Sequence, residues 1–170
     1  MSTQAISLPA IEQYLDSERK AEFGSEYLNS HVYAMSGGTL NHARIVRNTL
    51  AQFAETLRGA RCEAAGSDFR LFCARYNVFT YPEVVVTCGP HKSLDERHDT
   101  ITDTTFIAEV LSSSTKHYDR GEKFRYYRQP DGSWLFRELT SPGSEIEFNA
   151  IGCRLTLESL YEGVDFETET

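Results

Sequence analysis

The feature that most constrains the fold is a pair of short segments that are apolar on both faces. Val84-Val-Val-Thr87 is a compact β-branched run, which is typical of a central strand. In Thr104–Leu111, strand alternation places apolar side chains on both faces, and the one exception within Phe106–Leu111 is Glu109. Strands of this kind belong in the interior of a sheet that other elements cover.

Helices are predicted on both sides of these strands along the chain. Thr39 is a candidate N-cap of a long helix whose apolar residues recur every three or four positions to about Leu57, and Gly59 ends it. The remaining expected elements are a helix from Ser7 and Pro9 to about Arg19, a hairpin over 24–35 turning at Asn29-Ser30, strands at 67–73 and 77–81, a loop over 88–103, a helix from 112–115 to about 128, a hairpin of 134–139 with 145–148, and a helical turn at 156–161. This alternation predicts an α/β (α+β) fold, a single sheet flanked by helices, with an N-terminal helix and hairpin.

Length and composition exclude several classes of protein. The 170 residues fit one domain over 1–170, and 25% charged residues without a low-complexity tract argue against disorder. There is no apolar run long enough to span a membrane and no secretory h-region near Met1, so a cytoplasmic protein is expected. The four cysteines show no zinc-ligand spacing and are expected to be small buried hydrophobic residues in a reducing compartment.

The net charge of −8 argues against a protein covered in phosphate-binding cations. Basic residues nevertheless outnumber acids in 39–61 and in 114–128, whereas 156–170 carries acids and no Lys or Arg. This distribution is compatible with nucleic-acid binding on one face, or with ordinary solvated helix faces.

Glu109 is the candidate that the strand pattern itself singles out. A buried carboxylate costs several kcal/mol to desolvate unless it is neutralised, paired or bound to a metal. The residues alone leave three possibilities open: a Lys or Arg partner, a position at the open end of the strand, or a metal site.

Three further residues have similar alternatives. Glu83 follows Pro82 at the start of the valine-rich strand, where its side chain reaches a sheet edge or a cleft, or is simply exposed. Lys123 lies one helical turn after Asp119, which allows a surface ion pair or a functional ammonium group. Glu26 lies in the first hairpin, where an exposed acid is the ordinary interpretation.

Five segments occur in an order that resembles a known family. They are Ser25-Glu-Tyr-Leu-Asn, Val32-Tyr-Ala-Met-Ser-Gly-Gly followed by His42, Tyr81-Pro-Glu-Val-Val-Val-Thr-Cys-Gly89, Ala108-Glu-Val-Leu-Ser-Ser-Ser-Thr115 and Asp119-Arg-Gly-Glu-Lys123. Together they resemble the Uma-type putative restriction endonucleases, a branch of the PD-(D/E)XK nuclease superfamily, over nearly the whole chain. The resemblance implies a restriction-endonuclease-like fold with a central mixed sheet.

The resemblance also implies a set of catalytic residues. The family's hairpin acid falls on Glu26, the acid of its Pro-Asp motif on Glu83, and the Glu of its Glu-Val-Leu-Ser motif on Glu109. The family's lysine lies on the following helix, and the resemblance places it at Lys123; the parent superfamily has its lysine two residues after the Glu, where this chain has Leu111. Converging carboxylates without His or Cys suit Mg²⁺ or Mn²⁺, with Glu83 and Glu109 as the main ligands and Glu26 as an auxiliary ligand or water positioner. The implied reaction is hydrolysis of DNA phosphodiester bonds, with Lys123 orienting water or stabilising charge.

Weaker candidates and a rival hypothesis complete the sequence-based interpretation. His42 and Arg120 are candidate phosphate contacts, although His42 could equally pack internally. A homodimer is expected because cutting both strands of a duplex needs two active sites. The family usually has Asp where this chain has Glu83, and Arg128 runs almost directly into 129–134, where relatives carry a further strand. These departures favour the alternative of a catalytically decayed, non-catalytic interaction or nucleic-acid-binding module.

Overall fold

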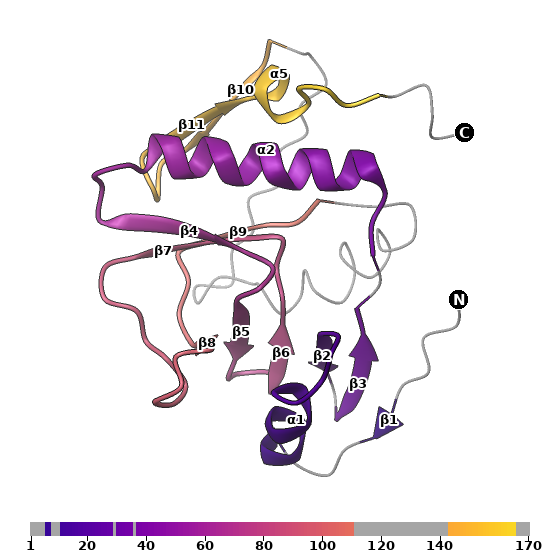
Figure 1. Cartoon of the computed structure of the whole chain (residues 1–170). Coiled ribbons are helices and arrows are strands. Elements are labelled where there is room, and N and C mark those ends of the chain that lie inside the picture. Colours follow the sequence, from indigo (N-terminus) through magenta and orange to yellow (C-terminus); the bar gives the residue numbers. More distant parts are fainter. Residues whose placement is uncertain (1–5, 8–10, 29, 36, 111–142, 166–170) are drawn as a thin grey trace.

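The computed structural model describes residues 6–7, 11–28, 30–35, 37–110 and 143–165, and these form a mixed α+β architecture (Figure 1). The described elements are β1 Ile6–Ser7, α1 Ile11–Glu18, β2 Ser25–Leu28, β3 His31–Ala34, α2 Leu40–Thr56, β4 Cys62–Gly66, β5 Arg70–Cys73, β6 Val78–Thr80, β7 Val84–Cys88, β8 Thr100–Ile101, β9 Phe106–Ala108, β10 Glu145–Phe148, β11 Cys153–Thr156 and α5 Leu157–Leu160. No helix among the described residues is long and apolar enough to cross a bilayer.

The strands form three hydrogen-bonded groups. A mixed sheet has the order β1-β3-β2-β6-β5-β8, in which β5 and β8 are parallel. A second, antiparallel sheet has the order β4-β7-β9, and β10 pairs with β11. Figure 1 shows α2 lying between the β4-β7-β9 sheet on one side and the β10-β11 hairpin with α5 on the other.

The buried faces of β7 explain this layering. Val84 and Val86 pack with Phe53 of α2 in one core cluster, whereas Val85 packs with Leu71 in another. Alternation therefore buries both faces of β7, which confirms the central strand that the β-branched run predicts. The long helix is also confirmed, because the Thr39 side chain accepts a hydrogen bond from the backbone N–H of His42 and begins α2.

A second core lies beneath α1. The rings of Tyr14 and Tyr27 are 5.2 Å apart, and Phe79 of β6 lies 5.1 Å from Tyr14. Phe72 of β5 stacks on Phe79 at 4.3 Å. These contacts fix the first hairpin, which was predicted correctly, against the β5-β6 pair.

Arg70 joins this region to the loop that follows β7. Only 3% of Arg70 is exposed, and its guanidinium donates to the Thr100 hydroxyl at 2.9 Å, pairs with Asp99 at 3.2 Å and donates to the Tyr81 hydroxyl at 3.2 Å. Arg19 at the end of α1 bonds to Asp99 at 2.8 Å. Buried Arg70 is thus fully engaged, as a buried cation requires.

Several expectations need correction. The strand expected over 104–111 is β9, which ends at Ala108, so Glu109 follows the strand rather than lying within it. β4 was not predicted, and β8 lies within the segment expected to be a loop. Glu145–Phe148 pairs with Cys153–Thr156, a strand that was not predicted. The expected helix over 112–128 and strand over 134–139 lie outside the described residues.

The expectation for the cysteines is wrong for two of the four. Cys62 and Cys88 lie directly opposite one another on β4 and β7, and their sulfur atoms form a disulfide. Cys73 and Cys153 are free thiols, and Cys153 is buried. Cross-strand neighbours bring two Cβ atoms close together, which is the geometry that a disulfide needs.

Candidate active site at the ends of strands β7 and β9

Glu83 and Glu109 meet at one edge of the β4-β7-β9 sheet. Antiparallel pairing places Val84 opposite Ala108, so the residue before β7 and the residue after β9 emerge side by side. The backbone N–H of Glu83 points to Oε2 of Glu109 at 3.4 Å. The two residues that the sequence selected are therefore brought together, by register rather than by a shared strand.

His42 closes one side of this edge. The first turn of α2 directs its Nε2 to the carbonyl oxygen of Val110 at 3.0 Å and to Oε1 of Glu83 at 3.6 Å. The imidazole is only 18% exposed and the Glu83 side chain 22%. His42 thus contacts the candidate site, whereas the sequence offered only a phosphate contact or internal packing.

Gly38 makes room for the His42 ring. A Cβ atom at position 38 would lie 2.6 Å from Nδ1 and 2.9 Å from Cγ of His42, far inside normal contact distance. A Cβ at the adjacent Gly37 would have no heavy atom within 4 Å. The second glycine of the pair therefore allows the chain entering α2 to lie directly against the imidazole.

The Glu26 carboxylate bonds to the segment that leads to Glu83. Its residue is 6% exposed, and Oε1 accepts a hydrogen bond from the Thr80 hydroxyl and one from the backbone N–H of Tyr81 at 3.2 Å. Tyr81 is two residues before Glu83, so Glu26 holds the segment that carries Glu83.

The Tyr81 side chain fixes the same segment from the other direction. Its hydroxyl donates to Oε1 of Glu18 at 2.9 Å and accepts from Arg70 at 3.2 Å. Burial, reinforced by the Glu18 carboxylate, raises the pKa of Tyr81 to about 12, so the phenol stays protonated and keeps donating. The backbone and the side chain of Tyr81 thus both restrict the position of Glu83.

The donor set at this edge suits a hard divalent cation. Glu83 and Glu109 supply carboxylate oxygens, and the Val110 carbonyl oxygen lies at the same place, within 3.0 Å of His42. Among the described residues, no group of three or more His, Cys, Asp or Glu side chains is arranged as a ready-made metal cage. Mg²⁺ is commonly held by one or two carboxylates together with water and substrate phosphates, so two acids are sufficient donors. Lys123 and Arg120 lie outside the described residues.

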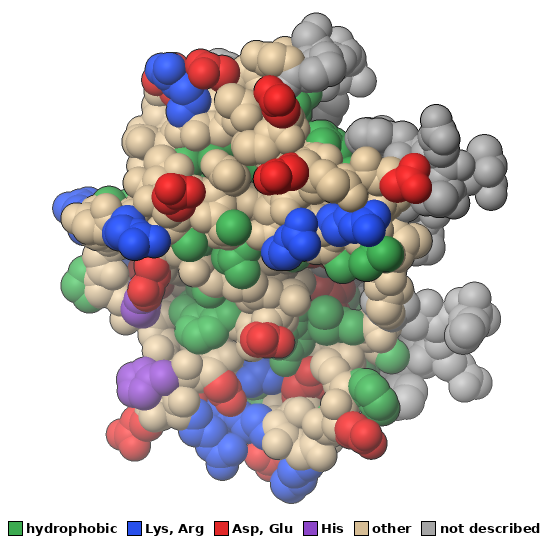
Figure 2. Space-filling model, turned by 45° about the horizontal axis from the view of Figure 1, so that its top comes forward, with side chains coloured by type: hydrophobic (Ala, Val, Ile, Leu, Met, Phe, Trp, Pro, Cys, Tyr) green, Lys and Arg blue, Asp and Glu red, His purple; other side chains and the backbone are tan. Residues whose placement is uncertain are grey.

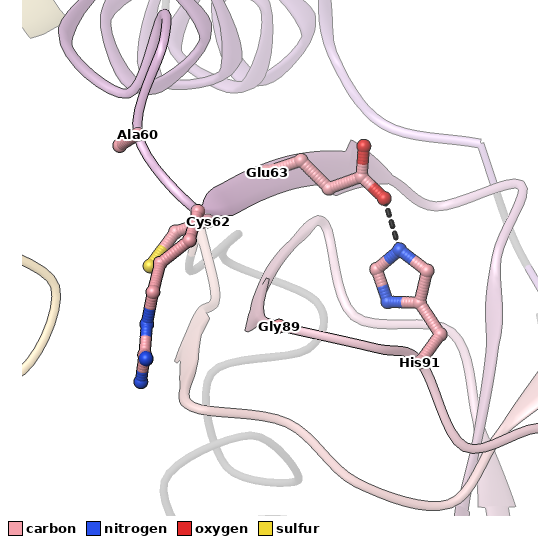
Figure 3. Close-up of a pocket in the computed structure, with 6 residues that line it drawn as sticks. Ala60, Cys62, Glu63, Gly89 and His91 are labelled. Carbon is pink, nitrogen blue, oxygen red and sulfur yellow. Dashed lines mark hydrogen bonds and ion pairs between the residues drawn. The ribbon is translucent and has the colours of Figure 1, made fainter.

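A separate hollow lies at the opposite end of the β4-β7 pair. It has a volume of about 240 Å³ and is lined by Ala60, Arg61, Cys62, Glu63, Gly89 and His91. Figure 3 shows the Glu63 and His91 side chains pointing toward one another, while Cys62 points away from them. The hollow is open and its acid and imidazole bond to each other, so it adds no residue to the Glu83 and Glu109 edge.

Sequence reasoning missed His42 and Val110 as members of this edge. His42 belongs to α2 and contacts Glu83 at the start of β7, far away in the sequence. Val110 takes part through its backbone carbonyl, which any residue could supply. The available signal was the Gly37-Gly38 pair followed by a capping Thr39 and then His42, which predicted a helix start but not what it faces.

Comparison with known proteins gives three results. The model of a family described as Uma2, putative restriction endonuclease, matches residues 11–137. The uncharacterized Synechocystis sp. proteins slr1290 and sll1609 are 31% and 28% identical; the matches cover 91% and 81% of this chain and 92% and 90% of the relatives. A crystal structure of a putative nuclease belonging to DUF820 from Anabaena variabilis aligns with a TM-score of 0.69 at 13% identity, covering 89% of this chain and 96% of that one.

The family match spans most of the chain and agrees with the resemblance seen in the sequence segments. The structural match confirms the expected fold class, a mixed α+β fold, and at 13% identity it shows the fold alone. The chain therefore belongs to the Uma2 family, whose description is putative restriction endonuclease.

Proposed function

We propose that this protein is a single-domain, divalent-metal-dependent endonuclease that hydrolyses phosphodiester bonds in DNA. The observation that carries the proposal is the meeting of Glu83 and Glu109 at one sheet edge, with the Glu83 N–H 3.4 Å from the Glu109 carboxylate. Membership of the Uma2 family supports the reaction class.

Glu83 and Glu109 would hold Mg²⁺ or Mn²⁺. A bound ion of this kind would supply a water of lowered pKa and neutralise phosphate charge. Glu26 keeps the Tyr81–Glu83 segment in place through the Tyr81 N–H. Lys123 is assigned the role of orienting the attacking water or stabilising the charge on phosphorus, on the strength of the family pattern. A homodimer would place two such sites on one duplex.

The test is nicking of supercoiled plasmid DNA with Mg²⁺ or Mn²⁺. Glu109→Gln and Lys123→Ala should each abolish nicking while circular dichroism shows an intact fold. Glu63→Gln is the matched control, because Glu63 is an exposed carboxylate on β4 near the far end of the sheet. It should cut at the wild-type rate.

Two outcomes would contradict the proposal. Intact plasmid at every protein concentration, with both ions, would favour the non-catalytic nucleic-acid-binding module. Equal loss of nicking in Glu63→Gln and Glu109→Gln would show that the activity does not depend on the Glu83 and Glu109 edge.

A further inference from the structure

Arginines lie on the exposed side of α2 and just past its end. Arg44 and Arg47 are three residues apart on the helix, which places them at neighbouring positions on one side. Arg58 comes two residues after Thr56, the last residue of the helix. Arg47 and Arg58 are exposed and Arg44 is partly so. Between them lie the exposed small residues Ala51 and Ala54, which permit close approach of a partner.

Two of these guanidinium groups are held in place by buried amides. Arg44 donates to Oδ1 of Asn41 at 3.1 Å, and Arg47 donates to Oδ1 of Asn48 at 2.8 and 3.2 Å. Both asparagines are over 90% buried.

Those amides are themselves fixed by the chain after α5. Asn48 donates through Nδ2 to the carbonyl oxygens of Leu160 and Glu162, and Asn41 exchanges hydrogen bonds with the backbone of Asp165. Asn48 therefore presents its amide oxygen to Arg47, and the Asn41 oxygen accepts from both Arg44 and the Asp165 N–H. The molecule orients Arg44 and Arg47 with neutral acceptors, at a separation of about 5–6 Å between Cβ atoms.

The charges of these arginines remain available. Within the described part of the chain, Arg44, Arg47 and Arg58 form no ion pair, whereas Arg19, Arg70 and Arg154 each pair with carboxylates. Figure 2 shows Lys and Arg side chains in a band across the middle of the face, bordered by acidic side chains. The exposed acids near these arginines include Glu55 on α2 itself, Glu158, Glu162, and Asp165, whose backbone bonds to Asn41. Because these acids repel phosphate, phosphate contacts on this face are expected only at the arginines.

The arginines and the candidate active site lie on different sides of α2. His42, whose Nε2 is 3.6 Å from the Glu83 carboxylate, comes two residues before Arg44, and two positions correspond to about 200° around a helix.

We propose that Arg44, Arg47 and Arg58 form a track, along the exposed side of α2 and just beyond its end, that binds the phosphate backbone of the nucleic acid. The inference rests on the proposed function for the identity of the partner. The planar guanidinium fork matches phosphate oxygens better than an ammonium group does, which explains why the track consists of arginine fixed by amides rather than of mobile lysine. A chain with a net charge of −8 needs such a confined basic track to approach a polyanion.

The test is fluorescence anisotropy of a labelled 20-base-pair duplex in EDTA, over a salt series. The double variant Arg44→Gln/Arg47→Gln should lose two phosphate contacts. The slope of log K against log salt should then fall by about 1.8, and binding at 0.1 M salt should weaken by about 60-fold. Arg47→Lys keeps the charge but not the fork and should lie between. Arg154→Gln is the matched control, because this exposed arginine pairs with Glu145 and Glu147.

An unchanged slope in the double variant, or an equal loss in Arg154→Gln, would overturn the inference. Equally tight binding of polyglutamate and duplex would overturn the assignment to nucleic acid. Nicking assays separate this inference from the proposed function. If the wild-type protein binds duplex through the arginines but never cuts it, the track is supported and the nuclease activity is refuted. If the wild-type protein cuts DNA and the double variant binds duplex normally, the nuclease activity is supported and the track is refuted.

Discussion

Replacing Gly38 by alanine should damage the candidate active site without touching any of its carboxylates. The added Cβ would lie 2.6 Å from Nδ1 of His42, whereas ordinary contacts begin near 3.4 Å. The ring must therefore move by about 0.8 Å, which stretches its 3.0 Å contact with the Val110 carbonyl beyond hydrogen-bonding distance.

The expected loss follows from that displacement. A hydrogen bond of this kind contributes about 1 kcal/mol, and a shift near 1 Å at a catalytic edge lowers rates by up to about 100-fold. We expect Gly38→Ala to lower the plasmid nicking rate by 10- to 100-fold and the melting temperature by only a few degrees. The assay pairs initial nicking rates with thermal melting of each variant.

Gly37→Ala is the matched control for this prediction. Its Cβ would meet nothing within 4 Å, and neither glycine has the positive φ that disfavours alanine. Gly37→Ala should keep the wild-type rate. If Gly38→Ala and Gly37→Ala cut DNA equally fast, the link between His42 and the candidate site is refuted.

Three further predictions concern stability. Reducing the Cys62–Cys88 disulfide, which closes a loop of 26 residues, should lower the free energy of unfolding by about 3–4 kcal/mol and the melting temperature by about 10 °C; an unchanged melting curve in reductant would contradict it. The hydrogen bonds from Arg19 hold the pKa of Asp99 well below its usual range, so the stability that this carboxylate contributes is present above about pH 4 and is lost as the pH falls further. Asp99→Asn should therefore show a flatter dependence of melting temperature on pH below about 4. Parallel curves for the variant and the wild type would refute this. Phe53→Ala, at a fully buried ring, should cost about 3–5 kcal/mol by urea denaturation, and a loss below 1 kcal/mol would contradict the described core.

The parts of the fold that follow from local patterns could be predicted from sequence. The β7 strand is specified by Val84–Val86, whose alternation suits burial on both faces, and α2 by the Thr39 cap and an apolar stripe. In contrast, β4 reads Cys-Glu-Ala-Ala-Gly, which has little strand propensity, and becomes a strand because β7 supplies its hydrogen-bonding partner. The cross-strand disulfide depends on that same pairing, so it could not be foreseen once β4 was missed.

The candidate site could be predicted only in part. The pattern singled out Glu109 as an unusual carboxylate and Glu83 as an acid at the start of a buried strand, and the family resemblance gave both a role. Residue physics alone left an ordinary ion pair open for Glu109 and simple exposure open for Glu83. Their meeting depends on the register of β7 with β9, which short strands do not reveal in sequence. The contact between His42 and Glu83 depends on how α2 packs across the sheet, and this angle is set by the whole core rather than by any local motif.

The central claim is that Glu83 and Glu109 together bind a divalent cation. Titration calorimetry with Mn²⁺ measures this directly in the wild-type protein, in Glu83→Gln and Glu109→Gln, and in Glu63→Gln as the control. We predict one site in the wild type and in Glu63→Gln, and a loss of Mn²⁺ affinity of at least tenfold in each of the other two. Equal Mn²⁺ affinity in all four proteins, or no binding in the wild type, would contradict the claim.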